Sequence, residues 1–366
     1  MKELAVGIVG AASRGRSFFA AFGGNPHTRI TALCDINEEG LASAASESGV
    51  SSTFASYEEM LDRARPDIVV VATPMQLHVP QAIMALDRGI HVLSEVTAAV
   101  SIEEAKELVQ TCKKSSGRYM MGENYNYVRH VVLVLQIARA GLFGETYFGE
   151  GEYVHELKGL NEITKWRRKW HTGINGNTYP THCLGPLLEW MDDRVVSVSC
   201  VGTGHHYQDP RGDHYENEDS TFMACRMSKG GLVNIRLDML SNRPPNMNYL
   251  SLQGTKGCYE SGRGFGDHPK IWLESRCDHE KWIPPETLEE EFLPAEWLHP
   301  PKEALEASHW GSDYMEVQDF VRAIVEDREM PVDIHRAMDY TLPGLMSQLS
   351  IEQGSVWLEV PDSREW

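Results

Sequence analysis

The chain lacks the cysteine pattern of a secreted or zinc-binding domain. It has seven cysteines in 366 residues, an odd number with no CxxC pair and no repeated spacing. Secreted domains pair their cysteines, and structural zinc sites bring them in closely spaced pairs. We therefore expect reduced thiols and a cytoplasmic location.

Long hydrophobic runs and an excess of basic residues are also missing. No stretch approaches the roughly 20 apolar residues that cross a bilayer. The first ten residues enter a strand without the apolar core of a secretion signal. The net charge is −19, and so acidic a surface repels nucleic-acid phosphates and anionic lipid. We expect neither nucleic acid nor a membrane as a partner.

What is present in the first third is an alternation of strand-like and helix-like segments. Apolar runs at 4–9, 30–34 and 67–72 are separated by helical stretches, which is typical of parallel βαβ units. The run DIVVVA at 67–72 is typical of a strand buried on both faces. The sequence predicts an α/β Rossmann domain over residues 1–123.

The pattern changes in the remainder of the chain. Strand-like runs at 221–227 and 232–240 are joined by Ser-Lys-Gly-Gly, which indicates a hairpin. We expect residues 124–366 to form a second α/β domain with an open, mostly antiparallel or mixed sheet. Residues 157–177 read as a long polar loop, and 262–308 as a proline-rich wrap-around segment.

A glycine turn follows the first strand, with the sequence Gly10-Ala-Ala-Ser-Arg-Gly15. This is a dinucleotide fingerprint whose middle glycine is Ala12. The first glycine makes the tight turn, the last lets the helix pack on the strand, and pyrophosphate binds at the helix N-terminus. The alternative is a glycine turn that holds no nucleotide.

Asp35 ends the second strand, 20 residues after Gly15. A carboxylate at this position accepts hydrogen bonds from the adenosine ribose and repels a 2′-phosphate, which favours NAD over NADP. Arg14 keeps NADP open, because a guanidinium in this turn can touch phosphate or stack on adenine.

The segment Ala72-Thr73-Pro74-Met-Gln-Leu-His78 resembles the ATP-x-x-x-H segment of the glucose–fructose oxidoreductase, inositol dehydrogenase and MocA superfamily. Phe143-Gly-Glu145 and the domain order fit the same group. The resemblance implies cofactor contacts near the nicotinamide ribose. Together with the glycine turn, the expected cofactor-binding residues are Gly10, Ala12, Ser13, Arg14, Gly15, Asp35, Thr73, Pro74, His78, Glu95 and Asn124.

One departure separates this chain from the dehydrogenases of that superfamily. Their next strand ends in Glu-Lys-Pro, with the Lys as acid/base, whereas this chain reads Glu95-Val-Thr-Ala-Ala99. That form is similar to the NAD-dependent α-N-acetylgalactosaminidases of glycoside hydrolase family 109. Further segments resemble this family in the same order: Glu123-Asn124, Tyr127-Val-Arg129, Gly141-Leu-Phe-Gly144, Lys165-Trp-Arg167, Asn175-Gly-Asn-Thr-Tyr179-Pro-Thr-His182-Cys-Leu-Gly-Pro186, Gln253-Gly-Thr-Lys-Gly257 and His309-Trp-Gly-Ser-Asp313.

The resemblance implies a redox-neutral hydrolysis. The sugar is oxidised at C3 by NAD, loses its C2 proton and its aglycone, adds water and is reduced again. Such a reaction needs proton carriers, not two opposed carboxylates. We expect His182 as acid/base, with Tyr179 and Tyr127 as further proton carriers or hydroxyl contacts. The alternatives are a helix-capping histidine and packing tyrosines.

Glu95, Arg167 and Lys165 are the expected substrate contacts. Arg167 and Lys165 lie in Lys165-Trp-Arg-Arg-Lys169, a cationic run that can clamp an anionic sugar or else is a solvated loop. The functional interpretation favours an anionic sugar over the N-acetylated sugar that the resemblance implies. His205, His206, Asp213 and His214 lack metal-ligand spacing, so we expect no metal.

Three functions stay open at this stage. They are an NAD-dependent glycosidase, an NAD-dependent sugar or polyol dehydrogenase, and a nucleotide-binding protein without catalysis. By resemblance alone, we also expect a homo-oligomer, dimeric or tetrameric.

Overall fold

The structure of the chain is a computed structural model that describes residues 3–244, 246–264, 266–278 and 280–366. The expectation that the first ten residues enter a strand includes Met1 and Lys2, which lie outside the described residues. The strands are β1 (Leu4–Val9), β2 (Thr28–Cys34), β3 (Thr53–Phe54), β4 (Ile68–Val71), β5 (His91–Glu95), β6 (Tyr119–Gly122), β7 (Thr146–Val154), β8 (Val195–Gly202), β9 (Ser220–Met227), β10 (Leu232–Asp238), β11 (Asn246–Gly254), β12 (Gly257–Glu260), β13 (Lys270–Leu273) and β14 (Leu358–Glu359).

The α-helices are α1 (Phe19–Gly23), α2 (Glu38–Ser48), α3 (Tyr57–Ala64), α4 (His78–Leu86), α5 (Ile102–Lys114), α6 (Arg129–Arg139), α7 (Lys158–Ile163), α8 (Trp166–Trp170), α9 (Thr181–Met191), α10 (Glu289–Phe292), α11 (Ala295–Leu298), α12 (Lys302–Glu306), α13 (Ser312–Val325) and α14 (Ile334–Glu352). Short 3-10 helices are η1 (Arg14–Phe18), η2 (Met75–Leu77), η3 (Asn124–Tyr127), η4 (Pro285–Leu288), η5 (His309–Gly311) and η6 (Ser363–Glu365).

The chain divides into two compact units, and neither is one continuous segment. The first unit is Met1–Val128, Pro300–Met338 and Ser363–Trp366, and the second is Arg129–His299 and Asp339–Asp362. The sequence-based boundary between residues 123 and 124 is a single cut in the chain, and it stays a prediction.

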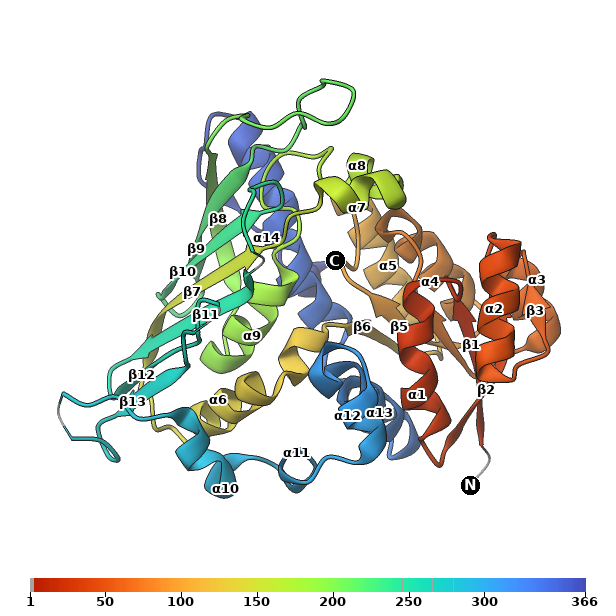
Figure 1. The fold of residues 1–366 in the computed structure, drawn as a ribbon, viewed down its shortest axis with the longest axis horizontal. Helices are drawn as coiled ribbons and strands as arrows, with labels where there is room; N and C mark the ends of the chain where they lie inside the picture. The colour runs from red at the N-terminus through yellow and green to blue at the C-terminus, as the bar shows by residue number, and fades with distance from the viewer. Residues whose placement is uncertain (1–2, 245, 265, 279) are drawn as a thin grey trace. The chain divides into compact units, whose positions relative to one another are not determined.

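The first unit is built on a six-stranded parallel sheet in the order β3-β2-β1-β4-β5-β6 (Figure 1). The predicted Rossmann domain is confirmed. β1 pairs with β2 on one side and with β4 on the other, so the strand order reverses at this point. All four residues of β4 are buried, as its continuous apolar run requires. Ligands of such sheets bind at the carboxyl ends of the strands around this reversal.

Helices of the first unit come from distant parts of the chain. α3, α4 and α5 pack in succession, and α1 packs against α13. α5 begins with a reciprocal cap, in which the Ser101 hydroxyl accepts from the Glu104 N–H and the Glu104 carboxylate accepts from the Val100 N–H. α13 carries buried polar residues as well as apolar ones. The first unit therefore needs residues that follow β6 by almost 200 positions.

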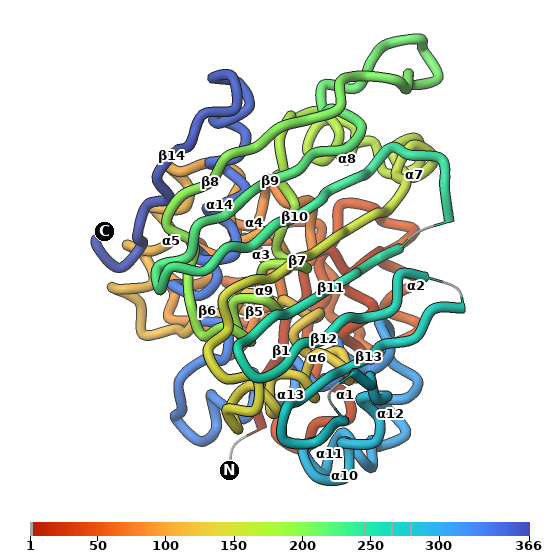
Figure 2. Tube along the Cα trace, turned by 90° about the vertical axis from the view of Figure 1, so that its left-hand side faces the viewer, coloured from red at the N-terminus to blue at the C-terminus, as the bar shows by residue number. Residues whose placement is uncertain are grey.

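The second unit contains an eight-stranded sheet in the order β13-β12-β11-β7-β10-β9-β8-β14. Only the β7–β10 pair is parallel among the described pairings, so the sheet is mixed, as predicted. The expected hairpin is β9–β10. Figure 2 shows the strands crossing the view in this order, from β14 at one edge to β13 at the other.

Helices cover one face of the eight-stranded sheet. α9 packs on β7 and β11, and α6 packs on α9 (Figure 1). The close approach of α9 depends on Gly151 of β7, because a Cβ there would lie 2.6 Å from the Cβ of Cys183. The opposite face keeps three large apolar side chains exposed, namely Val201, Phe222 and Leu232.

Two segments differ from expectation. Residues 157–177 are not an uninterrupted loop, because α7 and α8 lie within them. Residues 262–308 contain β13 and the short helices α10, α11 and α12. Helices of four to six residues are too short to show a 3.6-residue period, so they depend on tertiary contacts. In the described part of the chain, no helix has the length and apolar character needed to cross a bilayer.

Candidate functional site

The turn after β1 requires glycine at both of its ends. Gly10 has φ of 82°, and a Cβ there would lie 2.4 Å from the Ala72 carbonyl oxygen. A Cβ on Gly15 would lie 2.8 Å from the Gly10 carbonyl oxygen. Ser13 is exposed in this turn, and the following residues form η1 before α1 begins. The turn follows β1 at the strand-order reversal of the sheet, which is where sheets of this kind bind dinucleotides.

Asp35 follows β2 and lies beside this turn. Its Oδ2 accepts from the Ala12 N–H (2.9 Å), and its Oδ1 accepts from the Asn37 N–H (2.9 Å). A carboxylate has about four acceptor positions, so each oxygen can accept another hydrogen bond, as from a ribose hydroxyl. The next residue, Ile36, is 89% exposed and offers apolar surface to an adenine.

Arg14 of the turn binds carboxylates of its own unit. Its Nε donates to Glu95 (2.6 Å), and its Nη1 and Nη2 donate to the two oxygens of Asp313 (2.6 and 3.0 Å). Burial acts against the charge of Arg14, but Glu95 and Asp313 outweigh it and raise its pKa. The structure thus commits this guanidinium to the protein.

The Asp313 carboxylate also contacts the side chains of Asn124 and His309. The Asn124 amide donates to it at 2.8 Å, and Nδ1 of His309 lies 3.0 Å away. Burial alone would raise the pKa of Asp313, but the hydrogen bonds and charges of His309 and Arg14 hold it well below its usual range. The Asn124 Oδ1 is buried and has no hydrogen-bond partner among the described residues. A buried carbonyl oxygen of this kind is satisfied when a bound ligand donates to it.

The loops after β4 and β5 are joined by His78. Its Nδ1 lies 2.9 Å from the Thr97 carbonyl oxygen, and its Nε2 lies 2.8 Å from that of Thr73. Burial lowers the pKa of His78 despite these two bonds. Thr73 also donates its hydroxyl to Gln81, and Pro74 precedes η2. The imidazole therefore fixes the shape of the loop, and any cofactor contact of this segment falls to Thr73, Pro74 and the backbone.

Tyr179 and His182 of the second unit belong to a cluster of rings. Tyr179 precedes α9, and His182 is buried in its first turn. The two rings are 5.2 Å apart, and Tyr153, at the end of β7, lies 5.8 Å from Tyr179 and 5.3 Å from His182. His171 lies 4.9 Å from Tyr179. We call Tyr153, His155, His171, Tyr179 and His182 the ring cluster.

Two hydrogen bonds involve histidines of the ring cluster. Burial, with the nearby Arg167 charge, lowers the pKa of His155, which favours its neutral ring. Tyr153 can then donate its hydroxyl to Nδ1 of His155 (3.1 Å). Arg167 donates to Nδ1 of His171 (3.2 Å) and lies over the Trp166 ring. Neutral imidazoles and phenols in contact can pass protons to a bound substrate.

The predicted substrate and catalytic residues fall into both units. Arg167 also donates to the Thr164 hydroxyl, but no carboxylate pairs with it among the described residues. Lys165 is exposed just before α8. Tyr127 is buried in η3 with Asn124, so it belongs to the first unit, as Glu95 does. The structure brings together Tyr179, His182 and Arg167 in the second unit.

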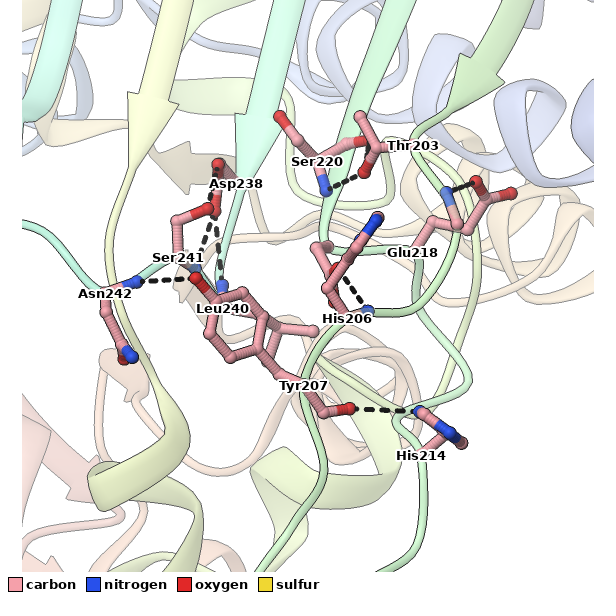
Figure 3. Close-up of polar contacts among 12 residues, drawn as sticks. Thr203, His206, Tyr207, His214, Glu218, Ser220, Asp238, Leu240, Ser241 and Asn242 are labelled. Atoms are coloured by element: carbon pink, nitrogen blue, oxygen red, sulfur yellow. Dashed lines mark hydrogen bonds and ion pairs between the residues drawn. The ribbon is translucent and has the colours of Figure 1, made fainter.

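A cavity of ≈ 440 Å³ opens beside His155 in the second unit, and Glu156, Asn242 and Arg243 complete its lining. Figure 3 shows Asn242 next to Tyr207, whose hydroxyl accepts from the Asn242 N–H at 3.3 Å. Of the ring cluster, His155 is the member that lines this cavity.

The histidines of the neighbouring loop have protein partners. His206 contacts Asp219 (2.6 Å), and Nδ1 of His214 lies 3.2 Å from the Tyr207 carbonyl oxygen (Figure 3). Within the described residues, no group of three His, Cys, Asp or Glu is arranged to hold a metal ion.

Sequence reasoning gave no site role to Tyr153, His155, His171 or Asp313, although Asp313 ends one of the segments that resemble family 109. Two signals were available: Tyr153 and His155 flank the end of a half-buried strand, and His171 follows Arg167 by four residues, one helical turn. Nothing local links Asp313 to Arg14, because 299 positions separate them.

Two known families match the two parts of the chain. Residues 4–123 match the oxidoreductase family with the NAD-binding Rossmann fold, and residues 127–365 match the C-terminal domain of glycosyl hydrolase 109. The chain belongs to glycosyl hydrolase family 109. It is an enzyme, and its cofactor is NAD, which fits the glycine turn, Asp35 and the Asn124 amide described above.

Curated relatives of this family-109 enzyme match over nearly its full length. A glycosyl hydrolase family 109 protein of Saccharopolyspora erythraea is 31% identical over 98% of this chain and 82% of its own. An alpha-N-acetylgalactosaminidase of Shewanella oneidensis is 29% identical over 99% of this chain and 85% of its own.

Solved structures share the fold at lower identity. Levoglucosan dehydrogenase in complex with NADH and levoglucosan superposes with a TM-score of 0.84, at 20% identity over 98% of this chain and 100% of the other. The WlbA dehydrogenase from Bordetella pertussis, in complex with NADH and UDP-GlcNAcA, gives 0.76 at 21% identity, over 98% of each chain. These family-109 and dehydrogenase chains therefore share one architecture.

Proposed function

We propose that this enzyme hydrolyses a glycoside by transient oxidation of the sugar at C3, with no net change of the cofactor. The ring cluster of the second unit carries the proposal, because it brings imidazole and phenol groups, which can carry protons, into mutual contact. The absence of the Glu-Lys-Pro lysine after β5 supports it, since simple alcohol oxidation would lack its usual acid/base there.

The roles we propose follow from the chemistry of each side chain. Bound NAD supplies the acceptor for the C3 hydride and the donor that returns it. His182 moves the proton at C2, and Tyr179 holds the proton of the C3 hydroxyl. Glu95 binds a ribose or sugar hydroxyl, and Tyr127 contacts a hydroxyl from the first unit.

The substrate class we propose is an N-acetylated or anionic sugar. Arg167 has no carboxylate partner among the described residues, so its guanidinium can donate to an amide carbonyl or to an acidic group of the sugar. Lys165 adds charge beside it. The name of the Shewanella oneidensis relative, an alpha-N-acetylgalactosaminidase, agrees with the N-acetylated form.

The test is cleavage of chromogenic glycosides of both anomers, N-acetylated and acidic, in deuterated water. We expect cleavage that depends on NAD, with solvent deuterium at C2 of the released sugar. His182→Asn should lower kcat by about 10²–10⁴-fold, the usual contribution of a general acid/base, and leave NAD affinity unchanged. His206→Asn, on the loop outside the ring cluster, is the matched control.

Two outcomes would overturn the proposal. Cleavage without deuterium at C2 excludes oxidation followed by elimination. Accumulation of NADH with free sugars, and no cleavage of any glycoside, makes the chain an NAD-dependent sugar dehydrogenase of the same superfamily.

A further inference from the structure

A strained loop holds Trp310 in the first unit. His309 and Trp310 have φ of 52° and 57°, and Gly311 has φ of 87°. Side chains with a Cβ are uncommon in this left-handed region, and two in succession are less common still. Gly311 cannot be replaced freely, because a Cβ there would lie 2.7 Å from the Ala304 carbonyl oxygen.

Contacts on both sides fix this loop. The Ser312 hydroxyl donates to the His309 carbonyl oxygen (2.8 Å), and the Gly311 N–H donates to that of Ser308 (3.2 Å). His309 contacts Asp313 through Nδ1 at 3.0 Å. The indole of Trp310 is nevertheless 71% exposed. A well-anchored, strained backbone therefore presents a large aromatic ring to solvent, which is typical of ligand-contacting segments.

The loop is tethered to the cofactor turn. Asp313 binds His309 on one side and Arg14 on the other, and Arg14 also binds Glu95 at the end of β5. Asp35, which takes the adenosine ribose, follows β2, on the other side of β1 in the sheet. A dinucleotide crosses the strand ends in this direction, with its nicotinamide half on the β4–β5 side. The tether of Trp310 therefore lies on the nicotinamide side.

We propose that Trp310 covers the nicotinamide half of bound NAD by stacking on its nicotinamide ring. The strain at residues 309–311 is the means by which the ring is held ready before the cofactor binds. Asp313 transmits the position of the loop to the glycine turn through Arg14.

The experiment compares NAD with ADP-ribose, which lacks only the nicotinamide ring, by calorimetric titration of the nucleotide-stripped full chain. Trp310→Ala should weaken NAD binding about three- to tenfold, the usual contribution of an aromatic contact. ADP-ribose affinity should stay within about twofold, because it has no ring to lose. Trp310→Phe should restore most of the NAD affinity. Leu305→Ala, an exposed apolar side chain of the same segment, is the matched control and should change neither.

A second readout is energy transfer from tryptophan to bound NADH, which should fall in Trp310→Phe at saturating NADH. Equal losses for NAD and ADP-ribose in Trp310→Ala would show that the indole only supports the loop. Unchanged affinity for both would show that it covers no part of the cofactor. Thermal unfolding of each variant checks folding, and an exposed side chain should leave the midpoint unchanged.

Discussion

At the scale of single residues, we propose that Asp35 favours NAD over NADP. Its carboxylate is held by two N–H groups and is free to accept from ribose hydroxyls. Hydrogen bonds to a charged group contribute about 1.5–3 kcal/mol, or roughly 10- to 100-fold in affinity. Asp35→Ala should weaken NAD binding by this range and reduce the preference over NADP, measured by titration with both. Asp87→Ala, an exposed aspartate of the same unit, should change neither.

Glu316 makes stability depend on pH. It is buried on α13, its two oxygens have no hydrogen-bond partner in the described chain, and Gly122 leaves it room. Burial raises the pKa of Glu316 well above its usual range, with help from Asp313 and Glu95 and against Arg14. The folded state then binds more protons than the unfolded state, so stability is full below the unfolded pKa and is lost as pH rises toward the folded one.

Glu316→Gln should therefore flatten the pH dependence, because an amide stays neutral. We expect the variant to match the native chain near pH 5 and to exceed it near pH 9 in urea unfolding. Glu290→Gln replaces an exposed carboxylate and should have the same free energy of unfolding as the native chain at both pH values. A larger stability gap at the lower pH would contradict the assignment.

How far the sequence predicts such residues depends on their separation along the chain. Gly10 and Asp35 are recognisable because a strand, a turn and the next strand give them a fixed context. The role of Asp313 was not recognisable, since it arises when α13 packs beside η1, and no local pattern records that contact. Two members of the ring cluster, Tyr179 and His182, were predicted because they share one sequence motif. Tyr153 was not, because it comes from β7, a separate element.

At the scale of elements, the N-cap of α5 should contribute measurably to the stability of the fold. Ser101 accepts from the Glu104 N–H at 3.1 Å. Ser101→Ala should lower the free energy of unfolding by about 1 kcal/mol, measured by urea denaturation. Ser101→Asp keeps an acceptor at the cap and should stay close to the native chain. An equal loss in both variants would mean that the hydroxyl acts through packing.

Helices and strands long enough to show a repeating apolar pattern were predictable from the sequence. Helices of one or two turns were not. α2, one of the helical stretches expected between the apolar runs, covers residues 38–48, because Asn37 caps it and Gly49 ends it in the left-handed region. α7 and α8 were missed, since one turn of helix bears no period and Trp166 and His171 are placed by ring contacts.

At the scale of the whole molecule, the open face of the eight-stranded sheet bears on assembly. Val201, Phe222 and Leu232 expose between 37% and 46% of their surface there. Contiguous exposed apolar surface marks an interaction site, so we expect a homo-oligomer paired through this face. Phe222→Asp should lower the molar mass in light scattering after size exclusion, while Ile163→Asp on α7 should not. An unchanged mass would place the contact elsewhere.

The first unit can be completed only late in synthesis, because its segments are far apart in the chain. Its sheet ends by residue 122, but α13 begins at residue 312. During synthesis, Arg14 and Asn124 emerge long before Asp313, so the turn that receives NAD stays without its carboxylate anchor until most of the chain has left the ribosome. A fragment ending near residue 128 would lack that anchor altogether, and nascent chains should acquire cofactor only near the completion of translation.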